Sequence, residues 1–310
     1  MSRPRDLVGL ASEHAATAAY LSGWRLVRLL PERTAQATFA RIADQVHRRD
    51  GRSVQRLRSN LSRVVPADRL EVTTHAGVRS YLRYWCESFR LPSWPTEDLV
   101  RRTHVIGEHH LRDPQSQGRG VVAVLPHMAN WDWAGAWACA TGMPLTTVVE
   151  RLEPARLYEE FVAYRRSLGM EILPLTGDDP PFPILARRVR EGRLICLLAD
   201  RDLSRTSVEV TLCGGAARMP RGPALLARAT GVSLVPMTLA YRGQDIELTF
   251  HEPVPHAPGT EGIVVMTQGV ADAFSAAIAA DPEDWHMMQR VFAAEPSRRG
   301  GGSRRGGGSR

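Results

Sequence analysis

His127 lies where a predicted strand meets a predicted helix, within the stretch VVAVLPHMANWDWAGAWA at 121–138. Residues 121–125 form a continuous apolar run rich in β-branched types, which predicts a fully buried strand. Pro126 ends that strand because proline has no N–H group for the hydrogen-bond ladder. From Asn130, a favoured N-cap residue, the apolar positions take helical spacing. Ligands of α/β sheets bind at the carboxyl ends of the strands, near helix N-termini, and His127 occupies such a position.

An imidazole in this position can act as a general base that takes a proton from a hydroxyl group. It must be neutral, with an acceptor bound to its other nitrogen, and Asp132 in the first turn of the predicted helix can fold back to provide that acceptor. The chain has no G-x-S-x-G sequence for a serine nucleophile and no second histidine at metal-ligand spacing from His127. The implied nucleophile is therefore a hydroxyl of the substrate. The alternative is a structural histidine that is hydrogen-bonded to a nearby loop.

A second acidic candidate follows another predicted buried strand. Asp200 comes at the end of the run LICLLAD at 194–200, so its placement repeats that of His127. The alternative is a carboxylate that pairs with Arg201 or Arg205.

Further polar residues predict the rim of a site that binds phosphate groups. Glu150 and Arg151 follow the apolar strand TTVV, Arg165 lies on the polar side of the next predicted helix, and Arg218 lies in a turn before another helix. Together with Arg201, these arginines are suited to phosphate because a guanidinium can donate two parallel hydrogen bonds. The alternative for each arginine is an ordinary solvated charge.

The charge of the chain is unevenly distributed. Its 310 residues include 40 Lys+Arg against 33 Asp+Glu, a formal net charge of +7, and none of the 40 is lysine, which excludes a P-loop lysine or a Schiff-base lysine. Residues 1–63 carry +7, residues 297–310 carry +5, and residues 64–296 therefore carry −5. This distribution predicts an anionic partner surface, either a membrane or a nucleic acid.

The cysteines and the adjacent histidines give no indication of a metal site. The four cysteines lie far apart in apolar surroundings, without a C-x-x-C pair, and are typical of reduced core residues in a cytosolic protein. His109 and His110 are adjacent, so their side chains diverge on either a helix or a strand. We therefore expect no metal.

The order of the predicted elements indicates an α/β fold. A helical front at 1–95 is followed by alternating strands and helices, which predicts a mostly parallel central sheet flanked by helices. We expect one domain over 1–296, with the α/β core at 96–296. The helices of the front are predicted near 33–48, 53–64 and 67–90. The strands are predicted near 103–106, 120–125, 145–149, 171–174, 194–199, 208–213, 233–239 and 246–250, and the remaining helices near 130–141, 154–168, 182–190, 222–230 and 261–280.

The two ends of the chain carry different predictions. Near the amino end no apolar stretch reaches the length of a membrane span, but Tyr20, Leu21 and Trp24 form a stripe at helical spacing beside Arg25 and Arg28. This pattern is typical of a helix that lies in a membrane interface, and the alternative is a stripe packed on the core. The tail SRRGGGSRRGGGSR at 297–310 has no apolar residue and is predicted to be disordered. No RNA-binding motif accompanies the tail, so we expect no nucleic-acid partner.

The chain resembles a known family of acyltransferases. HMANWD fits the His-x4-Asp motif of glycerolipid-type acyltransferases, and its NWD form after an apolar strand resembles the branch that contains the lipid A acyltransferases. The resemblance to the actinobacterial phosphatidylinositol mannoside acyltransferases runs from about Leu21 to Phe292. It is carried by TTVVERL, LYEEFVAYRRSLGMEILPLTG, ICLLADRDLSRTSVEV, ARMPRGPALLA and PEDWHMMQ.

The resemblance implies a function and a set of site residues. It implies transfer of a fatty acyl group from acyl-CoA, with no further cofactor, to the mannose 6-hydroxyl of a phosphatidylinositol mannoside at the cytoplasmic face of the plasma membrane. In that family the position matching Asp200 holds an acidic residue, often glutamate, that completes a site with His127 and Asp132, and an aspartate is one methylene shorter. The resemblance also makes His286 a candidate for the site.

Two other functions remain open at this point. One is a glycolipid O-acyltransferase of the lipid A type that uses an acyl carrier protein as donor, because it would have the same histidine and aspartates. The other is a basic lipid- or RNA-binding protein without enzymatic activity, which would tolerate the loss of His127.

Overall fold

A seven-stranded sheet forms the centre of the computed structural model, which describes residues 23–151, 154–176, 180–202, 204, 206–259 and 261–292. The strand order is β1-β9-β8-β2-β5-β3-β4, and every neighbouring pair is parallel except β8 and β9. The α/β fold with a mostly parallel sheet is therefore confirmed. The strands are β1 (Thr103–Ile106), β2 (Val121–Leu125), β3 (Leu145–Val149), β4 (Glu171–Pro174), β5 (Leu194–Leu198), β8 (Leu234–Arg242) and β9 (Asp245–Phe250).

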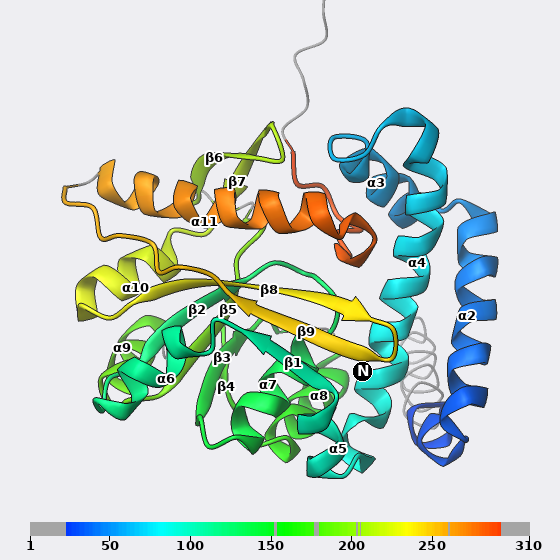
Figure 1. The fold of residues 1–310 in the computed structure, drawn as a ribbon, viewed down its shortest axis with the longest axis horizontal. Helices are drawn as coiled ribbons and strands as arrows, with labels where there is room; N and C mark the ends of the chain where they lie inside the picture. The colour runs from blue at the N-terminus through cyan, green and yellow to red at the C-terminus, as the bar shows by residue number, and fades with distance from the viewer. Residues whose placement is uncertain are drawn as a thin grey trace, which may run out of the picture.

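Helices cover both faces of this sheet. Figure 1 shows α10 (Gly222–Thr230) and α11 (Glu261–Ala280) on one side, and α7 (Trp131–Ala140) and α8 (Ala155–Ser167) on the other. The strand β2 lies in the middle of the sheet and all five of its residues are buried, because both of its faces are covered. The other helices of this part are α5 (Thr96–Arg101), α6 (His109–Ser116) and α9 (Pro181–Arg190).

Three helices form the predicted front of the molecule. They are α2 (Glu32–Arg49), α3 (Arg52–Leu61) and α4 (Ala67–Arg90), and Figure 1 shows α2 and α4 standing side by side at one end of the sheet. Their apolar residues join the same core as the sheet, as Leu57, Leu61 and Val78 illustrate. The short 3-10 helix at Pro282–Asp284 contacts α4 and β8, so the end of the described chain ties the front to the sheet.

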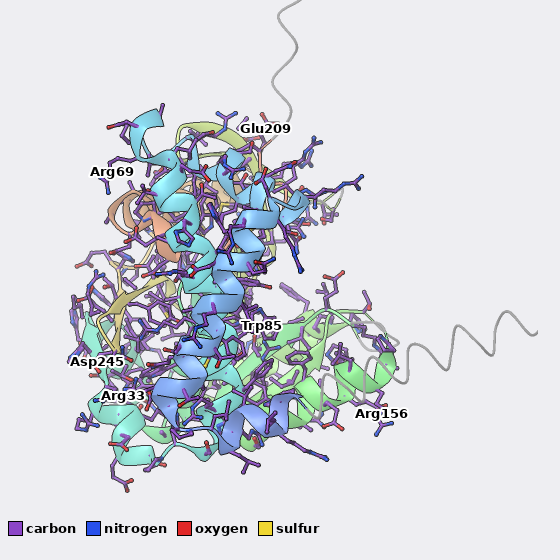
Figure 2. The ribbon with its side chains drawn as sticks, turned by 90° about the vertical axis from the view of Figure 1, so that its right-hand side faces the viewer. Arg33, Arg69, Trp85, Arg156, Glu209 and Asp245 are labelled. Atoms are coloured by element: carbon purple, nitrogen blue, oxygen red, sulfur yellow. The ribbon has the colours of Figure 1, made fainter. Side chains whose placement is uncertain are left out.

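The amino-terminal stripe proves to be part of the core where the structure describes it. Trp24 is only 5% exposed and packs against Phe89, Phe161 and Tyr164, whose ring centroids lie 5.1–5.5 Å from its own. Figure 2 shows this region, where α4 meets α8 near the labelled Trp85. Insertion of Trp24 into a membrane was therefore the wrong prediction, since packing against these rings buries its side chain. Tyr20, Leu21 and the tail at 297–310 lie outside the described residues.

Besides two short 3-10 helices, two α-helices and one strand of the described chain were not predicted from the sequence. The helices α5 and α6 are short, and α6 contains Pro114, which is unfavourable inside a helix. The strand β7 (Gly215–Met219) pairs with β6 (Val208–Leu212) in a separate hairpin, and its sequence GAARM has no β-branched residue. Tertiary packing therefore decides all three.

Helix α11 is long and apolar enough to cross a membrane by length and composition alone. In the structure one side of it is buried, including Met266, Val270 and Phe274, and it packs on the β6–β7 hairpin and on β8. A core helix gives the same composition, and this packing accounts for the apolar residues on the buried side, whereas Val264 and Val265 of the same helix are 39% and 59% exposed.

Candidate active site

The register of the sheet brings His127 and Asp200 together. The strands β2 and β5 are parallel neighbours in which Leu125 is paired with Leu198, so the residues two positions further on leave the sheet side by side. The Nδ1 atom of His127 lies 2.6 Å from Oδ1 of Asp200, and the His127 backbone N–H donates to Oδ2 at 3.0 Å. The shorter aspartate side chain therefore reaches the histidine. The alternative pairing of Asp200 with Arg201 is not what the structure shows, and Arg205 lies outside the described residues.

Charge and burial define the protonation of this pair. Asp200 is fully buried, and burial on its own raises the pKa of a carboxyl group, but the charge of His127 and the hydrogen bonds from His127 and Trp285 outweigh it and hold the pKa of Asp200 below its usual value. An ionised carboxylate only accepts hydrogen bonds, so Nδ1 of His127 carries the proton. In the neutral form of the ring, the lone pair is then on Nε2. The His127 side chain is 34% exposed, so the pair can meet a substrate.

Asp132 makes a different ion pair from the one predicted. Its carboxylate is bound by Arg165 of α8, with Nε to Oδ1 at 2.7 Å, and by the Tyr84 hydroxyl of α4 at 3.0 Å. The expected contact, in which Asp132 holds the second nitrogen of His127, is therefore made by Asp200 instead. The side chain of Asp132 lies in the first turn of α7, directly after the N-cap Asn130 and Trp131, and it points to Arg165 of α8. A catalytic role for Asp132 stays a prediction.

The Asp132–Arg165 pair nevertheless acts on the site through packing. Both side chains are largely buried, and the nearby Asp132 charge raises the pKa of the Arg165 guanidinium although burial acts to lower it. Tyr84 stacks on Trp131 with centroids 4.1 Å apart, and Trp131 packs edge-on against the His127 ring at 5.4 Å. The ion pair thus fixes the start of α7 and the aromatic side chains next to the histidine.

The other predicted site residues are spread more widely. Glu150 and Arg151 are exposed after the end of β3. Arg218 is exposed on β7, where its Nε donates to the Ser207 hydroxyl at 2.6 Å, whereas Arg201 is half-buried and lines a groove. His286 is buried, and its backbone N–H donates to the His127 carbonyl at 2.8 Å.

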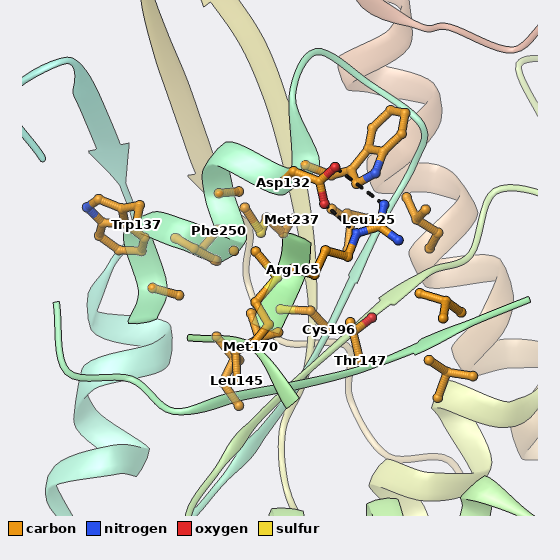
Figure 3. A pocket seen from close by; sticks show the side chains of 18 residues that line it. Leu125, Asp132, Trp137, Leu145, Thr147, Arg165, Met170, Cys196, Met237 and Phe250 are labelled. Carbon is orange, nitrogen blue, oxygen red and sulfur yellow. Dashed lines mark hydrogen bonds and ion pairs between the residues drawn. The ribbon is translucent and has the colours of Figure 1, made fainter. Parts of the chain in front are cut away.

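A narrow, mainly apolar cavity begins beside the histidine loop. Figure 3 shows the Asp132–Arg165 pair at this cavity. The remaining walls come mostly from apolar side chains of α7, of the strands and of the segment before β4, including Leu125, Trp137, Leu145, Met170, Met237 and Phe250. The cavity is therefore suited to an apolar ligand.

A wider groove of about 570 Å³ lies at the carboxyl ends of β3 and β5. Its apolar part includes Leu175 and Phe182, which are 51% and 39% exposed, and its polar part includes Arg201 and Arg221. Arg221 is also the N-cap residue of α10, so the groove opens at a helix N-terminus that favours anions. The groove is suited to a ligand with both apolar and anionic parts.

Comparison with known proteins identifies the class of reaction. A family model described as bacterial lipid A biosynthesis acyltransferase matches residues 9–294. The chain belongs to this acyltransferase family. Two members that it resembles are both named phosphatidylinositol mannoside acyltransferase. The protein of Mycolicibacterium smegmatis is 45% identical over 282 residues, which cover 90% of this chain and 91% of that protein. The protein of Mycobacterium tuberculosis strain H37Rv is 40% identical over 300 residues, which cover 95% and 94%.

As a member of this family, the protein transfers acyl groups. A glycolipid acyltransferase must remove a proton from a hydroxyl group, and the partly exposed His127 ring, bound through Nδ1 by Asp200, stays the predicted base for that step. In the described part of the chain no group of three or more His, Cys, Asp or Glu residues is placed to hold a metal ion. The buried contacts of Asp132 and of Trp285 were missed from the sequence, because neither follows from local spacing.

The ion pair of Asp132 generates a prediction on stability. Asp132→Asn leaves the buried Arg165 guanidinium without its charge partner, so we expect the free energy of unfolding to fall by about 3–5 kcal/mol. Tyr84→Phe is the matched control: it removes only a neutral donor from the same carboxylate, and we expect a loss of about 1 kcal/mol. Urea denaturation followed by tryptophan fluorescence measures both. Equal small losses in the two variants would contradict the structural role of the pair.

Proposed function

We propose that this protein transfers a fatty acyl group from acyl-CoA to the mannose 6-hydroxyl of a phosphatidylinositol mannoside. The observation that carries the proposal is the His127–Asp200 pair, in which a buried carboxylate holds Nδ1 and leaves Nε2 of a partly exposed imidazole free. The identity of the acceptor is supported by the names of the relatives. The acyl-CoA donor is supported by the resemblance of the sequence motifs.

In the proposed reaction His127 acts first as a base and then as an acid. Its Nε2 takes the proton of the mannose hydroxyl while the hydroxyl oxygen attacks the thioester carbonyl, so that a tetrahedral oxyanion forms. The ionised Asp200 stabilises the imidazolium that appears at this stage. When the intermediate collapses, the C–S bond breaks, and the CoA sulfur takes the proton from the imidazolium. The products are an ester and free CoA, and the enzyme returns to its starting state.

The oxyanion requires donors, and the start of α7 offers them. The first N–H groups of a helix have no partner within the helix. The N-cap Asn130 side chain accepts from Trp133 N at 3.0 Å, which leaves the N–H groups of Trp131 and Asp132 for other acceptors. We propose that these N–H groups, or the side chain of Arg201, stabilise the oxyanion.

The two hollows next to the pair are suited to different parts of the substrates. We assign the acyl chain to the narrow cavity beneath α7, because its lining is mainly apolar and it begins at Leu125 and Trp131 beside His127. We assign the phosphate-bearing parts to the groove with Arg201 and Arg221, because arginine binds phosphate with two parallel hydrogen bonds. In this arrangement the thioester carbonyl of acyl-CoA lies between the cavity and the groove, near Nε2 of His127.

The first test of this function is a product assay. We incubate the protein with palmitoyl-CoA and a mannosylated phosphatidylinositol and expect mass spectrometry to show the acceptor with one added palmitoyl group. His127→Ala should lower the rate by about 10²–10⁴-fold, the usual range for a lost general base. The exposed His109 on α6 provides a matched control, and His109→Ala should keep the wild-type rate.

Two results would revise the proposal. Product formation by His127→Ala at the wild-type rate would exclude the histidine as the base. Product formation only with palmitoyl-loaded acyl carrier protein, or only with a different glycolipid acceptor, would replace the proposed donor or acceptor while the same pair carried out the transfer.

We further propose that the protein works at the cytoplasmic face of the plasma membrane and binds the membrane through the start of its described chain. The helical residues 23–29 are anchored by Trp24 and Arg28, which both donate to the Phe89 carbonyl, at 3.2 and 2.8 Å. On the outer side Leu26 and Leu29 are 59% and 81% exposed. Leucines three positions apart share a helix face, and such an exposed apolar face on a basic segment is suited to an anionic lipid surface.

Vesicle binding tests this attachment. Changing both Leu26 and Leu29 to Gln should weaken cosedimentation with anionic vesicles by more than tenfold, because each buried leucine contributes about 1.5–3 kcal/mol. Val72 on α4 is 74% exposed and provides the control, and Val72→Gln should leave binding unchanged. Equal binding by the double variant and the control would show that the protein attaches through another surface.

A further inference from the structure

The segment Asp284–His286 lies against the loop that carries His127. The Ala129 N–H donates to the Asp284 carbonyl at 2.9 Å, and the His286 N–H donates to the His127 carbonyl at 2.8 Å. Ala129 has a φ of +43°, which is uncommon for a residue with a side chain. Such a conformation persists only where surrounding contacts impose it, and these two hydrogen bonds are such contacts.

Trp285, which lies between Asp284 and His286 in the sequence, contacts the Asp200 carboxylate itself. Its side chain is fully buried, and its indole Nε1 donates to Oδ2 of Asp200 at 3.0 Å. In the described part of the chain Asp200 accepts three hydrogen bonds from side-chain and backbone donors, and two of them come from His127. The third donor, the indole N–H of Trp285, does not come from His127. It can therefore hold the Asp200 carboxylate in place while the carboxylate orients the histidine.

The segment is in turn anchored to α4 and β8. The Asp284 carboxylate accepts from the Ser80 hydroxyl at 2.6 Å and from the Tyr241 N–H at 2.7 Å. The Ser80 hydroxyl proton is used by Asp284, so Nε2 of His286, 2.8 Å from the same oxygen, must be the donor in that contact. The helical front thus holds Asp284 by a hydrogen bond from Ser80, and the adjacent Trp285 holds Asp200 by another.

We propose that Trp285 is a positioning residue for acyl transfer: its indole N–H holds the Asp200 carboxylate in the orientation that leaves Nε2 of His127 free toward the substrate. This inference rests on the proposed role of His127 as the base. Without the indole N–H, one oxygen of a buried carboxylate loses a donor, so the carboxylate becomes more basic. A more basic carboxylate binds the imidazolium more strongly. The pair then loses its proton only at higher pH.

Two other titratable groups near the pair, Cys213 and His286, keep one charge state around neutral pH. Burial raises the pKa of Cys213 to about 11, and burial together with the charge of His127 lowers the pKa of His286 to about 3. Asp284 differs, since burial raises its pKa to about 6, but its carboxylate faces Ser80 and Tyr241 rather than Asp200. A control variant that keeps Asp284 shows the same titration of Asp284. A difference between the pH profiles of the test variant and the control therefore does not come from Asp284.

The test compares two buried tryptophans. Trp285→Phe removes the donor to Asp200, and Trp133→Phe removes an equally buried donor, whose Nε1 lies 2.8 Å from the Thr103 hydroxyl. With palmitoyl-CoA and mannosylated phosphatidylinositol, we expect Trp285→Phe to lower kcat about tenfold with little change in KM, and to move the acidic limb of the pH–rate profile upward by about one pH unit. Trp133→Phe should keep the wild-type acidic limb, even where the two variants lose similar stability.

A second measurement needs no substrate. Diethyl pyrocarbonate modifies the neutral imidazole, so the pH dependence of His127 modification, followed on its peptide by mass spectrometry, reports when the pair loses its proton. We expect the same upward shift in Trp285→Phe. If wild-type protein forms no acylated product but this shift is present, the proposed function fails while the positioning role of Trp285 stands.

An unmoved acidic limb and an unmoved modification profile in Trp285→Phe would overturn the inference and leave Trp285 as a core side chain. Should Trp285→Phe fold poorly, Ser80→Ala loosens the same segment by removing a single oxygen, and it should move both profiles upward by a smaller amount. Profiles identical to wild type in Ser80→Ala would then overturn the inference equally.

Discussion

The site depends on one constraint, which is that the buried charge of Asp200 has to be satisfied by hydrogen bonds. A carboxylate without contact to water is strongly unfavourable unless donors surround it. The parallel pairing of β2 and β5 supplies two of these donors from His127, and the segment after α11 supplies a third from Trp285. The sheet, its register and the carboxyl-terminal segment therefore converge on a single side chain, and the orientation of the histidine follows from them.

Asp132 of the HMANWD motif and Asp200 at the end of β5 have different charged partners. Asp200 faces the histidine, where in the proposed reaction it stabilises the charge that appears during transfer. Asp132 faces Arg165 and Tyr84, and so it joins α4, α7 and α8 at the mouth of the apolar cavity. His127 and Asp132 are only five positions apart in the sequence, yet their side chains have different partners. His127 is bound by Asp200 at the end of another strand, and Asp132 is bound by Arg165 on α8.

Local patterns in the sequence predicted most elements of the α/β part, and they predicted the place of His127 and Asp200 at strand ends. They do not contain the strand order, so the adjacency of β2 and β5 and the contact between these two residues could not be derived from them. The same limit applies to Asp132, whose partner lies on α8, and to Trp285, which is distant in the chain. Trp24 shows a related limit, because one apolar stripe fits both a membrane face and a core face until its neighbours are known.

The most direct test of the account is the protonation state of the His127 ring, observed by ¹⁵N NMR on selectively labelled protein with His127→Ala used for assignment. The account predicts that the neutral His127 ring carries its proton on Nδ1 and a lone pair on Nε2. This tautomer preference should be lost in Asp200→Asn and kept in Asp132→Asn. A proton on Nε2 in the wild type, or a preference that depends on Asp132 instead of Asp200, would contradict the account.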